Sequence, residues 1–202
     1  LVGDSSPLMQ LRNAGEDLPD AYRAAAERTL EIRGEEGTGW SLGWKILFHA
    51  RLGNAEQALQ QILKQLRPIA GPGDERPEQG GSYPNLFSAH PPFQIDGNYA
   101  SGAGVAAMFV QSRVDWEYEE PQIHIDLLPA LPESWGKGRI RGLRAKGKLE
   151  LTIDYDRGKL KSLEIVNRSS ETQTIQLRER HGSLHRQLRL EPGQGFGTEI
   201  RP

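Results

Sequence analysis

Three features are missing from this sequence of 202 residues: cysteine, long apolar runs, and an excess of one charge. Without cysteine there are no disulfides and no thiolate metal ligands, and the redox compartment stays undetermined. No apolar run approaches the ~20 residues of a membrane-spanning helix, so we expect no membrane partner. The 25 basic and 27 acidic residues nearly balance, which predicts no nucleic-acid surface.

The N-terminus also lacks the basic and then apolar segments of a secretory signal peptide. It begins with leucine rather than methionine, so we expect the true start to lie elsewhere. The overall composition, 36% hydrophobic and 26% charged, is typical of a globular protein and argues against disorder. A chain of this length is enough for one large or two small domains.

The first half of the chain has helical periodicity. Proline at position 19 suits the start of a helix over Asp20–Arg33, and a buried helix is predicted over Trp40–Leu52. Asn54 is expected to cap a third helix, and a fourth is predicted from about Gly97 to Ser112, with close helix packing at its glycines. The third helix carries an apolar stripe that we assign to the core: Ala55, Ala58, Leu59, Ile62, Leu63 and Leu66.

The second half alternates between apolar and polar residues. Pairs such as Ile123 with Ile125 and Leu149 with Leu151 recur between glycine turns, and Asp156-Arg157-Gly158-Lys159 predicts a hairpin. This pattern favours an antiparallel β-sandwich. His181 and His185 are four residues apart, but on strands that spacing does not converge on zinc, so we predict no metal site and no cofactor.

A long segment between these halves, residues 80–98, has neither period. It contains three prolines and three glycines, yet it also keeps several large apolar residues, which is typical of a functional loop packed by its own side chains. The prolines stiffen the backbone between His90 and Asp96, as a binding site for a polar, uncharged ligand such as a sugar requires. Alternatively, Asp96 simply caps the helix that follows.

The two tryptophans at the start of the second helix also have two interpretations. We assign Trp44 to the core, because it recurs at helical spacing with apolar neighbours. Trp40 lies at the helix start, where its ring either packs in the core or lines a sugar pocket. His49 lies in the middle of this helix and is interpreted as a satisfied structural histidine.

Several of these stretches resemble one enzyme family, the inverting α-L-fucosidases of glycoside hydrolase family 95. The resemblance covers about residues 17 to 165. It rests on Tyr-Pro-Asn-Leu-Phe at 83–87, Ala-His-Pro-Pro-Phe-Gln-Ile-Asp-Gly-Asn at 89–98, Thr-Leu-Glu-Ile-Arg-Gly at 29–34, Gly-Thr-Gly-Trp-Ser-Leu-Gly-Trp-Lys at 37–45, Leu-Leu-Pro-Ala-Leu-Pro at 127–132, and Gly-Leu-Arg-Ala-Lys-Gly at 142–147.

The resemblance implies a fold in two parts. Residues 1–115 are expected to be the last helices of an (α/α)6 barrel, and residues 116–202 a C-terminal β-sandwich domain. It also implies a fucosylated oligosaccharide or glycan as the partner. Because fucosidases of this type digest glycans outside the cytoplasm, it further implies a secreted or periplasmic protein.

The resemblance assigns roles to two residues. Asp96 matches a catalytic carboxylate that polarises a water-contacting asparagine, and His90 matches a histidine that contacts the fucose; Trp40 is our candidate for an aromatic wall of the site. No segment matches the family's general-acid glutamate or its asparagines. We therefore expect an incomplete active site that is inactive alone. The alternatives are a non-catalytic carbohydrate-binding or structural remnant, an α-L-galactosidase, or another α/α-barrel glycosidase.

Overall fold

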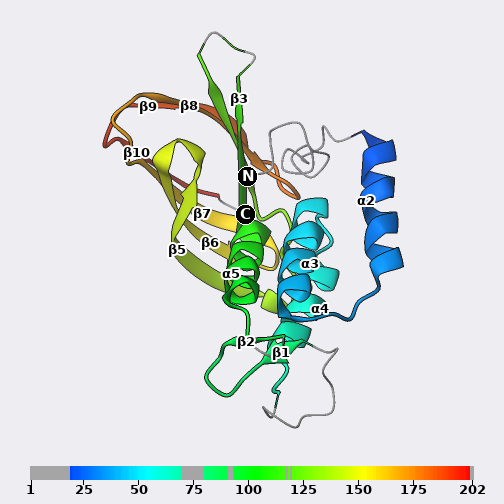
Figure 1. Ribbon diagram of the computed structural model, residues 1–202. Helices are drawn as coiled ribbons and strands as arrows, with labels where there is room; N and C mark the ends of the chain where they lie inside the picture. Colours follow the sequence, from blue (N-terminus) through cyan, green and yellow to red (C-terminus); the bar gives the residue numbers. More distant parts are fainter. Residues whose placement is uncertain (1–18, 70–79, 91–92, 117, 119, 201–202) are drawn as a thin grey trace. The chain divides into compact units, whose positions relative to one another are not determined.

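A computed structural model describes residues 19–69, 80–90, 93–116, 118 and 120–200 of the chain (Figure 1). The chain divides into two compact units, Leu1–Met108 and Phe109–Pro202. Helices dominate the first unit and strands the second, as the change of periodicity predicted. In the described part of the chain, no helix is long and apolar enough to cross a membrane.

The helices begin and end close to the predicted positions, with one exception. The helices are α2 (Asp20–Arg33), α3 (Gly39–Leu52), α4 (Ala55–Gln65) and α5 (Ile95–Phe109). The prediction was wrong for the end of α5, because Val110–Asp115 forms strand β3 instead of continuing the helix. These residues pair in register with β4 (Gln122–Leu127), so tertiary pairing decides a segment whose local pattern is ambiguous.

The core between α2 and α3 is small and aromatic. Ala26, Leu30 and Leu52 form a buried cluster against which Trp44 and Phe48 pack. The two rings meet edge to face with centroids 5.1 Å apart. The assignment of Trp44 to the core is therefore confirmed.

The apolar stripe of α4 is only partly buried, so its assignment to the core was wrong in part. Leu63 and Leu66 are 54% and 61% exposed, whereas Gln61 and Gln65 are buried. The helix thus turns its glutamines toward its neighbours in this unit and leaves two leucines facing outward. Asn54 does occupy the N-cap position, but its side chain makes no capping hydrogen bond.

Helices α3 and α5 approach closely, and two glycines permit it. A β-carbon at Gly104 would lie 2.5 Å from Ile46 Cγ2, and one at Gly43 would lie 2.7 Å from Ala100 Cβ. Such distances lie below normal van der Waals contact, so neither position accepts a larger residue without displacement. Gly102 has open space around it, which corrects the prediction that it also serves close packing.

The second unit contains two four-stranded sheets, with strand orders β3-β4-β8-β9 and β10-β7-β6-β5. The strands not yet defined are β5 (Lys137–Ala145), β6 (Leu149–Asp156), β7 (Lys159–Asn167), β8 (Gln173–Glu179), β9 (His185–Leu190) and β10 (Gly195–Glu199). Short 3-10 turns occupy Glu133–Trp135 and Lys146–Lys148. The alternation seen in the sequence is confirmed, since β6 buries every second residue from Leu149 onward.

Of two further predictions about this unit, one is confirmed and the other was wrong. The predicted hairpin is confirmed: β6 and β7 pair across a turn in which Arg157 and Gly158 both have positive φ, at 51° and 74°. That geometry matches the right-handed twist of the flanking strands. The prediction of a purely antiparallel unit was wrong, because β4 and β8 pair in parallel.

Asn167 begins the sequence Asn-Arg-Ser, which is a formal glycosylation signal. In the folded chain this asparagine is fully buried at the end of β7. Its Nδ2 donates to the carbonyl oxygens of Glu171 and Leu190, at 2.8 and 2.9 Å. The side chain therefore closes a turn and is not accessible to a glycosyltransferase in the folded state.

Candidate functional site

The centre of the candidate site is a short hairpin inside the 80–98 segment. Strands β1 (Gly81–Ser82) and β2 (Ser88–Ala89) pair antiparallel, and the Tyr83 N–H donates to the Phe87 carbonyl oxygen at 2.9 Å. The rings of Phe87 and Phe93 stack with centroids 4.9 Å apart. The loop is therefore held partly by its own side chains, as its composition predicted.

Asn98 fixes the hairpin to the first turn of α5. Its Oδ1 accepts the Ser88 N–H at 2.8 Å, and its Nδ2 donates to the Leu86 carbonyl oxygen at 2.9 Å. Leu86 has a positive φ of 68°, which is uncommon for a leucine and marks a constrained turn. No role was predicted for this asparagine from the sequence, although it is the last residue of the 80–98 segment. The available signal was a polar side chain in the first turn of a helix that follows a loop.

Ser88 is the point where the helix N-termini of α3 and α5 meet the hairpin. It is fully buried, and its Oγ accepts a hydrogen bond from Gln65 Nε2 at 3.1 Å. A β-carbon at Gly39 or Gly97 would overlap the Ser88 side chain. Only glycine at both positions lets the two helices begin against the hairpin, at the end of α3 and α5 where Figure 1 shows β1 and β2.

The three predicted site residues flank this meeting point. Trp40 follows Gly39, His90 follows Ala89, and Asp96 precedes Gly97. Trp40 is 43% exposed and Asp96 is exposed, while His90 is half-buried. The structure thus brings residues that are 50 and 56 positions from Trp40 in the sequence to the same end of two neighbouring helices.

The alternative that Asp96 caps α5 was wrong. Helix α5 begins at Ile95, so Asp96 lies within its first turn, and its Oδ1 accepts the N–H of the adjacent Gly97 at 3.0 Å. An N-cap would instead accept from the second or third N–H of the helix. A carboxylate in a first turn still interacts favourably with the helix dipole, by about 0.3–1 kcal/mol. This small gain leaves the exposed carboxylate available to another group.

Gln94 is a second residue that sequence reasoning missed. Its backbone N–H donates to the Ser88 carbonyl oxygen at 3.1 Å. Its side-chain Oε1 is buried and has no hydrogen-bond partner within the part of the chain that the structure describes. A buried amide oxygen without a partner is costly, by about 1–3 kcal/mol, and such groups concentrate where a ligand or a further segment supplies the missing donor.

A separate polar hollow of about 460 Å³ lies between α2, α3 and α4. It is lined by Lys45, His49 and Gln61, together with several glutamates. Lys45 is buried, its Nζ donates to the carbonyl oxygens of Gly34 and Glu36 at 2.8 and 2.7 Å, and burial lowers its pKa. This lysine holds the α2–α3 connection in place, a role with no sequence signal.

His49 departs from its prediction as a satisfied histidine, because its Nδ1 is buried without a partner among the described residues. Burial lowers the pKa of His49; Glu35 opposes this shift and Lys45 adds to it. Between the lowered pKa and the ordinary value of about 6.5, the unfolded chain binds more protons than the folded chain. Stability therefore falls as the pH decreases through this window.

We expect His49→Gln to reduce this loss of stability. The free energy of unfolding in urea, measured at several pH values from about 8 to 5, should fall less steeply in the variant than in the parent chain. The remaining histidines are common to both proteins and cancel in the difference. Parallel curves for the two proteins would show that His49 titrates alike in the folded and unfolded states.

Across the residues that the structure describes, no cluster of three or more histidine, aspartate or glutamate side chains is arranged to hold a metal ion. Neither His181 nor His185 is buried; the first lies in a turn and the second begins β9.

Comparison with known proteins adds sequence relationships to this geometry. Residues 7–109 match the model of the glycosyl hydrolase family 95 catalytic domain, and residues 121–193 match the model of the glycoside hydrolase family 95 C-terminal domain. The chain is 44% identical over 137 residues to alpha-L-fucosidase 2 of Arabidopsis thaliana. It is 30% identical over 131 residues to the probable alpha-fucosidase A of Aspergillus niger.

These alignments cover 67% and 61% of the present chain, respectively, but only 15% of each relative. The chain therefore spans a small part of the length of the curated proteins that it matches. Strand β3 lies between the two matched regions, because the first match ends at residue 109 and the second begins at residue 121.

Proposed function

The chain belongs to glycosyl hydrolase family 95, and from this premise we propose that it is the C-terminal part of an α-L-fucosidase. The complete enzyme would remove terminal α-L-fucosyl residues from oligosaccharides with inversion of configuration. The observation that carries the proposal is the placement of Asp96 and His90 beside the meeting point of α3, α5 and the hairpin. The names of the relatives support the substrate class.

In this proposal the two units are parts of different domains. Residues 1–115 would contribute the last helices of an (α/α)6 barrel, and residues 116–202 would form a β-sandwich domain. The exposed Leu63 and Leu66 of α4, and the exposed Ile32 of α2, support the first assignment. Large apolar side chains on the outer faces of helices indicate surfaces that pack against further protein.

The proposed chemistry divides the work between this chain and the rest of the enzyme. An inverting glycosidase needs a general acid at the leaving oxygen and a base that activates water on the opposite face. Asp96 would act on the base side by polarising an asparagine of another segment, and His90 would bind the fucose. Trp40 would offer its exposed ring to the apolar face of the sugar. The general acid is not among the residues that we assign here.

The test compares the 202-residue chain with a longer protein that also contains the upstream segments of its relatives. We expect the longer protein to hydrolyse an aryl α-L-fucoside and the short chain to lack measurable turnover, because we assign the general acid to the upstream segments. Proton NMR during the first minutes of reaction should detect β-L-fucose as the initial product. Initial α-L-fucose would contradict inversion.

An inactive longer protein would overturn the proposal and favour a non-catalytic carbohydrate-binding remnant. In that case weak fucose binding should still depend on Trp40 and His90. Preference for an aryl α-L-galactoside over the fucoside would instead retain the mechanism and change the substrate.

A further inference from the structure

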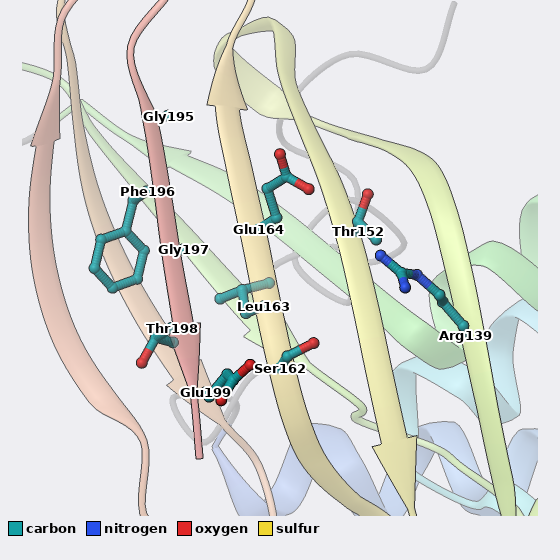
Figure 2. A pocket seen from close by; sticks show the side chains of 10 residues that line it. All are labelled: Arg139, Thr152, Ser162, Leu163, Glu164, Gly195, Phe196, Gly197, Thr198 and Glu199. Carbon is teal, nitrogen blue, oxygen red and sulfur yellow. The ribbon is translucent and has the colours of Figure 1, made fainter.

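A polar hollow lies within the second unit, on the face of the sheet β10-β7-β6-β5 that is turned away from the other sheet of this unit. Its volume is about 440 Å³, within the range of about 300–1,000 Å³ of small-molecule sites. Figure 2 shows that the side chains of Arg139, Thr152 and Glu164 stand around it on three neighbouring strands.

Two glycines of the edge strand β10 create the space. Gly195 and Gly197 pair with Val166 and Glu164 of β7, so they occupy outward positions. Side chains alternate between the faces of a strand, so the intervening Phe196 points to the other sheet. The centroid of its ring lies 4.8 Å from the guanidinium carbon of Arg186. Figure 2 shows the Phe196 ring on the side of β10 away from Glu164.

The outward face is organised in rows across the strands. In one row Ser162 Oγ donates to Asp154 Oδ2 at 2.5 Å, and Arg139 Nε lies 3.4 Å from the other oxygen of that carboxylate. In a second row Arg144 and Glu150 form an ion pair at 2.7 Å. Asp154 in the first row and Glu150 in the second therefore each have an arginine partner within the sheet.

The row between them is different. Thr152, Glu164 and Gly197 are aligned by the strand register, and β5 is interrupted here by an irregularity between Ile140 and Leu143. Glu164 is exposed and has no ion pair within the described residues, and Thr152 has no side-chain hydrogen bond there. The middle row therefore presents a carboxylate and a hydroxyl beside a glycine that leaves the space next to them open.

These groups select a class of ligand. A carboxylate accepts hydrogen bonds from two adjacent hydroxyls, and a guanidinium and a threonine hydroxyl supply donors nearby. Glu164 and the neighbouring Glu199 leave the hollow with an excess of negative charge, which disfavours an anion. A calcium ion would need six to eight oxygen ligands, more than this row provides.

We propose that this hollow is a saccharide-binding site that takes a neutral sugar with adjacent hydroxyl groups. The hydroxyls of the sugar bond to Glu164 and Thr152 of the middle row, and Arg139 stands at the far side of the hollow, three strands from Gly197. Because β10 is the edge of its sheet, a longer oligosaccharide can continue past it. The choice of a saccharide among neutral polyols rests on the function proposed above.

The experiment titrates the ¹⁵N-labelled 202-residue chain with methyl α-L-fucopyranoside, methyl β-D-galactopyranoside and a neutral fucosylated trisaccharide. We expect saturable amide shifts at Glu164, Gly195 and Gly197 with at least one of them. Glu164→Gln should weaken that binding by about tenfold, as expected for the loss of a charged acceptor.

Filling the hollow gives a second variant that preserves the fold. A β-carbon at Gly197 would have as its nearest neighbour the Leu163 carbonyl oxygen at 3.9 Å, an ordinary contact, and Gly197 does not have a positive φ. Gly197→Ile is therefore expected to fold and to lose the binding. Gln187→Ile, which adds the same side chain at an exposed position of edge strand β9, is the matched control and should bind like the parent.

Absence of shifts with all three sugars, or unchanged affinity in folded Gly197→Ile, would overturn the proposal. Shifts with an organic amine such as tris but not with the sugars would also overturn it and identify an acidic amine site. The readout is independent of hydrolysis: Asp96→Asn should leave these shifts unchanged, so failure of this site and failure of the proposed function are separable.

Discussion

Replacing Asp96 by asparagine in the longer protein is expected to lower turnover of an aryl α-L-fucoside by about 10²- to 10⁴-fold. This is the typical contribution of a general acid or base. Asparagine keeps the size of the side chain and its acceptor oxygen, so the bond from the Gly97 N–H is retained and the helix start persists. The charge that would polarise the asparagine of another segment is lost. Sugar binding should largely remain, which places the effect in kcat rather than in KM.

The chain supplies a matched control for this substitution. Asp20 is also an exposed carboxylate in the first turn of a helix, α2. Asp20→Asn makes the same chemical change and loses the same kind of helix-dipole interaction, about 0.3–1 kcal/mol. It should leave turnover unchanged. If Asp96→Asn retained the parental kcat, or if both variants lost activity equally, the catalytic assignment of Asp96 would be wrong.

The second large effect concerns the fold of the site. Gly97→Ala is expected to lower the free energy of unfolding by about 1–3 kcal/mol, as is typical of overpacking. Its β-carbon would overlap Ser88 and would lie 2.8 Å from the Gly39 carbonyl carbon. The Ser88 side chain can rotate, but the Gly39 backbone moves only with the start of α3. The substitution therefore pushes apart the first turns of α3 and α5, which carry Trp40 and Asp96.

Gly102→Ala is the control in the same helix. Nothing lies within 4 Å of a β-carbon at this position, and alanine is the better helix former by about 0.5–1 kcal/mol. We expect this variant to be more stable than the parent, so the two substitutions should have opposite signs. Urea unfolding followed by circular dichroism measures both. Equal effects would show that the Gly39–Ser88–Gly97 contact does not limit the packing of α5.

The sequence predicted helices and strands best where a segment showed a single local pattern. Helix α2 begins and ends at the predicted residues, and the hairpin at Arg157 and Gly158 forms as its turn residues indicated. Strands β5 and β10 were missed. The first is rich in basic side chains and the second in glycine, because edge strands do not need an apolar residue at every second position.

The leucines of α4 show a different limit. Leu63 and Leu66 have the spacing of a buried stripe, yet they are exposed, while Gln61 and Gln65 are buried. Helical periodicity says that a face is apolar, but it does not say which protein surface covers that face. If the chain packs against further barrel helices, as we propose, the sequence pattern describes a contact with a segment outside this chain.

The sequence by itself determined the family, the succession of a helical part and a strand-rich part, and the motif that contains His90 and Asp96, because all of these are local patterns of residues. Only the tertiary structure decided that Trp40 lies at the same helix ends as that motif, that Asp96 is inside α5 rather than capping it, and that the glycines of β10 open a hollow. These features depend on contacts between residues far apart in the chain. Steric fit and strand register settle such contacts, and neither leaves a periodic trace in the sequence.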